Sequence, residues 1–217
     1  MTTTHNELKK RWNELMKSLG VNDARGEIFN DLVARYSEPH RRYHTLEHIV
    51  NMLREFAKVK AHASYPKAVE FAIWFHDAIY DTRREDNEQA SAKLAVEAVK
   101  KLGITNGVFG DIFSPKVYEL VLTTEYKRLP GDADEDLLAD LDLATLASDP
   151  EIFDENMKKI REEYSWLSDE QFKWGRIMFM RNMLSRPRIY SSPRTREKYD
   201  ARARANLERS IKKLKEE

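Results

Sequence analysis

The chain contains no cysteine. This absence excludes disulfide bonds, thiolate metal ligands and cysteine nucleophiles, so any metal must be held by imidazole and oxygen ligands. Glycine and proline are also scarce, with seven of each among 217 residues, and the alternation of apolar and polar residues that marks strands is hard to find. The pattern therefore favours helices.

Net charge is absent as well, because 37 Lys and Arg residues balance 37 Asp and Glu residues. Such a chain has no global field that draws it to nucleic acid or to an anionic membrane. Its first residues lack the basic and apolar regions of a signal peptide, and its most apolar stretch, Ala68 to Tyr80, is too short to span a bilayer. We expect a cytoplasmic protein that binds neither membranes nor specific nucleic acids.

Helix-start signals recur along the chain. Ser114-Pro115 and Asp149-Pro150 each place a capping side chain before a proline at the first helical position, and Ser168 opens a capping box. With 41% hydrophobic residues, the chain has enough apolar surface for one domain over residues 1–217. We predict an all-α fold with helices near 5–19, 23–36, 44–60, 66–80, 86–102, 115–125, 134–147, 151–165, 169–185 and 195–215.

The predicted helix from Ala68 to Tyr80 is apolar nearly all round its circumference, which is typical of a helix in the middle of a bundle. His76 and Asp77 lie near its end, where burial without compensation is costly. One interpretation is that His76 and Asp77 form a hydrogen bond with each other, or that both find hydrogen-bond partners at the end of the helix. The other is a pair of metal ligands.

The distribution of histidine supports a metal site. All six histidines lie in the first 76 residues, so a site that uses histidine must complete its ligands with carboxylates. His44 and His48 lie 28 to 32 residues before His76, a distance that suits an antiparallel helical hairpin. Their i,i+4 spacing lets them chelate one cation or stand one behind the other, although two solvent-facing histidines would have the same spacing. The histidines are His5, His40, His44, His48, His62 and His76.

Asp140 and Asp142 lie two residues apart in a helical segment and therefore on different faces. If one of them points inward, its carboxylate completes a shell of two nitrogen and two oxygen ligands around Mn²⁺, Mg²⁺, Fe²⁺, Co²⁺ or Zn²⁺. The alternative is that both face solvent.

The motifs Arg41-Arg-Tyr-His44-Thr, Trp74-Phe-His76-Asp77-Ala and Asp140-Leu-Asp142-Leu together resemble the H…HD…D signature of the HD-domain phosphohydrolases. More narrowly, segments 42–49, 74–81 and 87–92 resemble the predicted metal-dependent phosphohydrolases of the HD superfamily, and the similarity continues as far as Leu207. This ordered set is specific for fold and metal site and much less specific for substrate.

The resemblance implies an HD-domain helical bundle with additional C-terminal helices and a metal at its centre. In the family pattern the first ligand histidine is followed by Ser or Thr and preceded three residues earlier by Arg. His44, with Thr45 and Arg41, fits this pattern better than His48, which then lies behind the ligands or in the substrate pocket. The resemblance thus implies that one divalent cation per chain is held by His44, His76, Asp77 and Asp142.

Two departures from the family pattern are present. The chain has no histidine between the HD pair and Asp142, which argues against a dinuclear centre. Where the narrower group is expected to have Thr-x-x-His, this chain has Thr124-Glu-Tyr-Lys127, so Lys127 would supply the positive charge.

The expected activity is hydrolysis of a small phosphate ester or nucleotide by a metal-activated water. Asp81 and Glu88 are the candidates for orienting the water or protonating the leaving oxygen, and ordinary surface charge is the alternative for both. Guanidinium groups pair bidentately with phosphate, although ion pairs with the chain's own carboxylates are the alternative. The predicted substrate-binding residues are Arg41, Arg42, His48, Lys127 and Arg176.

Two other functions compete with this one. His44-Thr-Leu-Glu47-His48 matches the H-x-x-E-H motif of zinc peptidases, in which Glu47 would be the base, but this leaves the HD pair unexplained. An HD fold that binds a nucleotide or metal as a sensor, without turnover, is the second alternative. We favour the phosphohydrolase over both.

An apolar stripe in the helix predicted over 169–185 fits either a place in the core, which we favour, or a homodimer contact. The stripe consists of Phe172, Trp174, Ile177 and Met178.

Overall fold

The computed structural model describes residues 3–23, 25–104 and 112–216, and every regular element in these residues is a helix. The predicted all-α class is therefore confirmed. The chain divides into two compact units, Met1–Leu138 and Ala139–Glu217, which are described one at a time below. That residues 1–217 form one domain stays a prediction. No helix in the described part of the chain is both long enough and apolar enough to cross a membrane.

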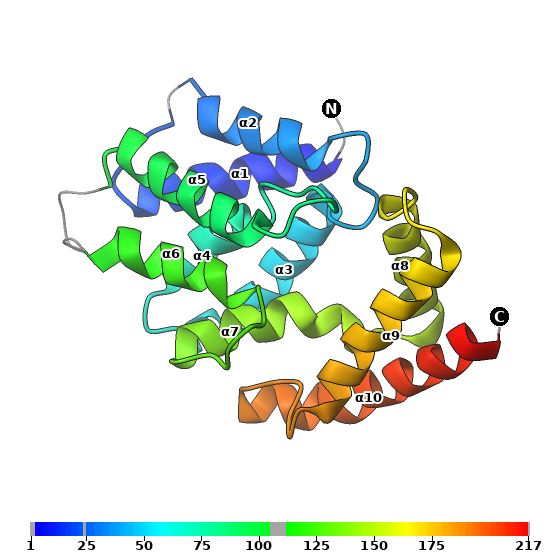
Figure 1. Ribbon diagram of the computed structural model, residues 1–217. Coiled ribbons are helices and arrows are strands. Elements are labelled where there is room, and N and C mark those ends of the chain that lie inside the picture. Colours follow the sequence, from blue (N-terminus) through cyan, green and yellow to red (C-terminus); the bar gives the residue numbers. More distant parts are fainter. Residues whose placement is uncertain (1–2, 24, 105–111, 217) are drawn as a thin grey trace. The chain divides into compact units, whose positions relative to one another are not determined.

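The first unit is built around α4, a ten-residue helix over Pro66–Phe75. All side chains from Ala68 to Phe75 are buried, and the helix contacts α1, α3, α5 and α6 (Figure 1). The predicted central position of this apolar segment is thus confirmed. The other elements of the unit are α1 (Thr3–Ser18), α2 (Glu27–Tyr36), α3 (Leu46–Val59), the 3₁₀ helix η1 (Lys60–His62), α5 (Asn87–Lys101), α6 (Phe113–Thr123) and the beginning of α7 (Ala133–Asp142).

The helix predicted over 66–80 ends earlier than expected, at Phe75. The carbonyls of Asp77 and Ala78 accept hydrogen bonds from the Arg41 guanidinium, at 2.7 and 3.1 Å. The Ile79 N–H donates to the Ser91 hydroxyl at 3.0 Å, and that hydroxyl lies 3.2 Å from the Ile79 carbonyl. Because these side chains satisfy the backbone after Phe75, the chain turns there, and His76 and Asp77 lie in the turn.

The segment that leads into α4 is held by a residue from a distant part of the chain. The N–H groups of Ser64 and Tyr65 donate to the carboxylate of Asp134, at 2.7 and 3.0 Å. Asp134 belongs to the first turn of α7 and is 1% exposed. Both N–H groups lie immediately before Pro66, so this buried carboxylate joins α7 to the segment that leads into the central helix.

The second unit contains the end of α7, the 3₁₀ helix η3 (Leu143–Ala147), α8 (Pro150–Glu163), α9 (Asp169–Ser185) and α10 (Pro193–Glu216). Helix α10 contacts η3, α8 and α9 (Figure 1). The helix predicted over 134–147 becomes a 3₁₀ helix after Asp142. Asp140 is buried and accepts hydrogen bonds from the N–H groups of Ser191 and Ser192, at 2.7 and 2.9 Å, immediately before α10.

The helix-start signals have mixed outcomes. The capping box at Ser168 is confirmed, since its hydroxyl accepts from the Gln171 N–H and the Gln171 side chain accepts from the Ser168 N–H. Helix α8 begins at Pro150 as predicted, but the Asp149 carboxylate pairs with Arg202, at 3.1 Å. Helix α6 begins at Phe113, so Ser114 and Pro115 lie within its first turn.

The apolar stripe on α9 does not share one environment. Phe172 is buried, whereas Trp174 is 70% exposed and Met178 is 44% exposed. The expectation of a core position therefore holds for Phe172 and is wrong for Trp174 and Met178. The homodimer contact stays a prediction.

Candidate metal centre

Two turns of chain in the first unit carry the site. Thr45 is the N-cap of α3, and its hydroxyl accepts from the Glu47 N–H at 3.3 Å. This cap places His44 just before the helix and His48 in its first turn. Helix α3 packs against α4, whose end delivers His76 and Asp77. Local helix boundaries and one helix–helix contact thus bring four predicted residues into one region.

Three donor atoms converge in this region. The Nε2 atoms of His48 and His76 lie 3.2 Å apart, and Asp77 Oδ2 lies 3.0 Å from His76 Nε2 and 3.9 Å from His48 Nε2. Both imidazoles are almost completely buried, at 4% and 1% exposure. With metal–ligand bonds of about 2.1 Å, neighbouring ligands of one cation lie about 3.0–3.4 Å apart. Two of the three distances fall in that range.

The other ring nitrogen of His76 orients the imidazole. His76 Nδ1 lies 3.0 Å from the Ile73 carbonyl, which can only accept, so Nδ1 carries a proton. In the neutral ring, Nε2 is then an unprotonated lone pair that points at the convergence. Histidines that bind metals usually donate their second nitrogen to a carbonyl or carboxylate in this way.

Asp77 is held in its ionised form. Burial raises the pKa of Asp77, but the neighbouring imidazoles of His76, His44 and His48, together with the hydrogen bond from His76, outweigh burial and lower the pKa below its ordinary value. An ionised carboxylate beside two buried imidazoles is a nitrogen and oxygen donor set that suits Zn²⁺, Mn²⁺, Fe²⁺ or Co²⁺. The residues present therefore fit a divalent cation.

His44 lies at the edge of this arrangement. Its ring stacks on Tyr80 with a centroid separation of 4.1 Å, and its centroid lies 6.1 Å from that of His48. It is near enough to Asp77 to lower the pKa of that carboxyl. The distances between donor atoms single out His48. The assignment of His44 to the ligands and of His48 behind them stays a prediction.

A signal in the sequence could have drawn attention to His48. His48, Met52 and Phe56 follow each other at i,i+4 spacing and are all buried, so His48 belongs to the core-facing stripe of α3. His44 precedes the helix and is half-buried. The positions of Met52 and Phe56 alone would have predicted that His48 faces the core.

Arg41 connects the two turns. Its guanidinium donates to the carbonyls of His44, at 3.2 Å, Asp77 and Ala78, and its Nε donates to Glu38 at 3.0 Å. The side chain is 0% exposed. These bonds hold the His44 turn against the turn of the HD pair, so Arg41 positions the site. The predicted contact of Arg41 with substrate stays a prediction, and neighbouring Arg42, which is exposed, is better placed for it.

Of the two candidates for proton transfer, Glu88 has the more unusual environment. It is half-buried in the first turn of α5. Burial, together with the negative charges of Asp77 and Glu125, raises its pKa, and a backbone hydrogen bond and the charge of Lys127 only partly oppose this. Asp81 is exposed, and its carboxylate accepts from the Arg83 N–H at 2.9 Å, which shapes the turn before α5.

Lys127, a predicted substrate-binding residue, is exposed and lies 3.4 Å from a carboxylate oxygen of Glu125. Its charge also acts on Glu88. Asp77, Glu88, Glu125 and Lys127 thus form one electrostatically connected group in the first unit. The contact of Lys127 with substrate stays a prediction.

Two predicted residues belong to the second unit. Asp142 is the last residue of α7 and is half-buried. Arg176 lies on α9, where its Nη2 is 3.3 Å from Met157 Sδ and its guanidinium lies 4.8 Å from the centre of the Phe179 ring. The roles of Asp142 as a ligand and of Arg176 as a phosphate contact stay predictions.

Comparison with known proteins adds no relative: no family model matches the chain, and neither the curated proteins nor the solved structures contain a match. The resemblance to the HD-domain phosphohydrolases therefore stays a prediction, and function must be argued from the residues themselves.

Proposed function

We propose that this chain is a metal-dependent phosphohydrolase of the HD-domain type that acts on a small phosphate ester or nucleotide. The observation that carries the proposal is the convergence of His48 Nε2, His76 Nε2 and Asp77 Oδ2 in the first unit. A purely structural His–Asp pair needs one imidazole. The second buried imidazole, 3.2 Å away, is better explained by a shared cation.

In this proposal His76 and Asp77 hold the cation with His48, His44 or both, and Asp142 adds a further carboxylate. When bound, a divalent cation lowers the pKa of a coordinated water and polarises a phosphoryl oxygen. The protein keeps His76 in the required tautomer through Ile73 and keeps Asp77 ionised through the surrounding imidazoles.

Glu88 is the proposed proton donor to the leaving oxygen. Its raised pKa keeps it protonated to higher pH than an ordinary carboxyl group, which is what a general acid needs. The charge of Asp77 contributes to this raised pKa, which supports a role for Glu88 beside the proposed ligands. Arg42 and Lys127 are the proposed phosphate contacts because both are exposed cations on the segments that border this group.

The peptidase alternative receives less support. In the H-x-x-E-H motif both histidines bind the same ion and the glutamate acts beside it. Here His48 faces His76, His44 stacks on Tyr80, and Glu47 is exposed. That alternative also assigns no role to the buried His76–Asp77 pair. The sensor alternative shares the metal site and differs only in the absence of turnover.

The decisive experiment measures bound metal and phosphate release on the same preparations. Metal-stripped full-length protein is reloaded with Mn²⁺, Co²⁺, Mg²⁺ or Zn²⁺, dialysed and analysed by mass spectrometry of the metal, beside His76→Ala and Asp77→Asn. We expect about one metal per chain in the wild type and loss of binding in both variants. His62→Ala removes an exposed histidine and is the matched control. Equal metal content in the wild type and in both HD variants would disprove the site.

Two further variants decide between the candidate histidines. His44→Asn and His48→Asn are compared for metal affinity, and the residue whose loss costs more affinity is the stronger ligand. Glu47→Gln abolishes activity only if the protein is a peptidase.

Turnover is tested on nucleoside mono-, di- and triphosphates and simple phosphate esters. Glu88→Gln is expected to lower kcat by about 10²–10⁴-fold without changing metal content, whereas Glu85→Gln, at an exposed nearby carboxylate, leaves kcat unchanged. Metal binding without turnover on any substrate would favour the sensor. Full activity of Glu88→Gln would remove Glu88 from the mechanism.

A further inference from the structure

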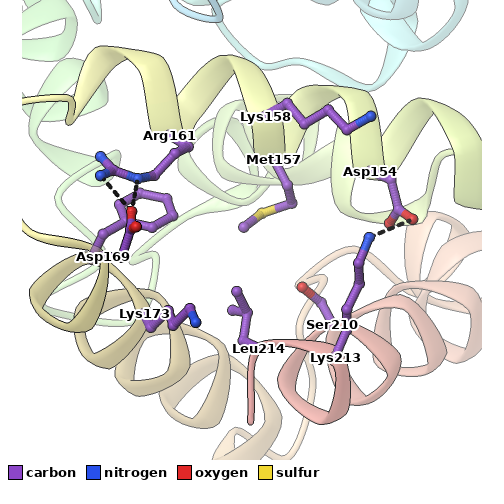
Figure 2. Close-up of a pocket in the computed structure, with 10 residues that line it drawn as sticks. Asp154, Met157, Lys158, Arg161, Asp169, Lys173, Ser210, Lys213 and Leu214 are labelled. Atoms are coloured by element: carbon purple, nitrogen blue, oxygen red, sulfur yellow. Dashed lines mark hydrogen bonds and ion pairs between the residues drawn. The ribbon is translucent and has the colours of Figure 1, made fainter. Parts of the chain in front are cut away.

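The second unit contains a cavity of about 400 Å³ between α8, α9 and α10 (Figure 2). This volume lies in the range of small-molecule sites, about 300–1,000 Å³. The cavity is formed entirely by the second unit, whereas the histidines of the candidate metal centre belong to the first. Its lining combines three apolar side chains with four cationic groups, two carboxylates and a serine.

The apolar part of the lining comes from all three helices. Met157 extends into the cavity from α8, and Leu214 extends toward it from α10 on the opposite side (Figure 2). Phe172 of α9 completes the apolar surface and is itself 6% exposed. An apolar ligand body can therefore contact three helices at once.

The charged part of the lining has an excess of positive charge, since four cations accompany two carboxylates. Arg161 pairs with Asp169, at 2.8 Å, and donates hydrogen bonds to the carbonyls of Tyr164 and Leu167, which follow α8. Lys213 lies 3.9 Å from Asp154. The remaining cations, Lys158 and Lys173, make no hydrogen bond or ion pair with any residue that the structure describes.

Asp154 attracts Lys158 and Lys213, but it makes its closest contact with an arginine. Its carboxylate lies 2.8 Å from the Arg209 guanidinium, and the hydrogen bond from Arg209 lowers its pKa. The two carboxylates at the cavity are thus already paired with arginines, which leaves a net positive surface beside the apolar one.

We propose that this cavity binds an amphipathic organic anion, with its apolar body against Met157, Phe172 and Leu214 and its acidic head paired with Lys173. Lys173 is half-buried and its ammonium group lies at the cavity in Figure 2. A cation beside apolar surface has lost part of its hydration, so an anionic head restores favourable contacts that the unliganded side chain lacks. Lys158, which is exposed, adds longer-range attraction. The proposal is independent of the metal site.

The test is isothermal titration of metal-free, full-length protein with decanoate, decyl phosphate, decanol and inorganic phosphate, all below micellar concentrations. We expect saturable binding of one decanoate or decyl phosphate per chain, and at least about tenfold weaker binding of decanol, which lacks the charged head. The tighter of the two anions identifies the head group. If neither anion binds saturably, or if decanol binds as tightly as both, the proposal is wrong.

Two variants locate the binding. Lys173→Met is expected to lower the affinity for the anions about tenfold and to leave the affinity for decanol unchanged. Leu214→Trp, which fills the cavity, is expected to lower the affinities for the anions and for decanol together. Lys212→Met, at an exposed α10 lysine paired with Glu216, is the matched control for lost charge. Unfolding curves establish that each variant is folded. Unchanged anion affinity in Lys173→Met would overturn the proposed head-group contact, and unchanged affinity in Leu214→Trp would place the ligand elsewhere.

Discussion

Replacing Arg41 by methionine tests whether this residue joins the two turns of the candidate metal centre. The buried guanidinium donates to the carbonyls of His44, Asp77 and Ala78. Hydrogen bonds to a charged group each contribute about 1.5–3 kcal/mol, and a buried acceptor left without a donor costs about 1–3 kcal/mol. Allowing for relaxation and for the removed cost of burying the charge, we expect Arg41→Met to lower the free energy of unfolding by about 3–5 kcal/mol.

The measurement is urea unfolding of metal-free protein, followed by tryptophan fluorescence. Trp12 and Trp74 are buried in the first unit, whereas Trp166 and Trp174 of the second unit are exposed, so their emission is expected to change less on unfolding. Arg42→Met is the matched control: Arg42 is exposed, so its loss is expected to cost less than about 0.5 kcal/mol. Arg41→Lys keeps the positive charge but lacks the planar guanidinium and its several N–H donors. It should therefore be more stable than Arg41→Met and less stable than the wild type. A change below about 1 kcal/mol in Arg41→Met would refute the claim that this residue holds the site together.

Two further predictions concern other carboxylates of the first unit. The pKa of Asp77 is lowered from its ordinary 3.8, so its contribution to stability is present above that pH and is lost as the pH falls further. Unfolding at pH 7, 5, 4 and 3 should therefore show a steeper loss of the free energy of unfolding for metal-free wild type than for Asp77→Asn. Parallel curves would contradict this. Asp134→Ala removes the buried acceptor of the Ser64 and Tyr65 N–H groups and is expected to cost about 2 kcal/mol in urea unfolding. Asp136→Ala, in the same turn and less buried, should cost much less.

The parts of the fold that follow from local chemistry were predictable. The composition and the scarcity of glycine and proline predicted an all-α chain, and the capping box at Ser168 marked the start of α9. The run Ala68–Tyr80 was identified as central because a helix that is apolar all round has no face for solvent, although the helix itself ends at Phe75. Each of these inferences depends on residues that are close together in sequence.

The details of the site depended on contacts that are distant in sequence. Arg41 was expected at the substrate because arginine pairs with phosphate, but its guanidinium is buried against backbone carbonyls some 36 residues away. The same contact ends α4 at Phe75, so His76 and Asp77 lie in a turn and not in the predicted helix. Asp134 and Asp140 likewise accept hydrogen bonds from backbone N–H groups that are distant in sequence, and no local pattern identifies these partners.

What the sequence by itself determined is therefore the helical class and the central helix, whereas its set of cation ligands stays a prediction. The sequence determined the helices because secondary-structure preference is a property of single residues and their near neighbours. Only the tertiary structure decided that His48 Nε2 faces His76 Nε2, that Arg41 braces both turns, and that a cavity with unpaired lysines forms in the second unit. Those features arise from the packing of helices, whose geometry is set by side chains far apart in the chain.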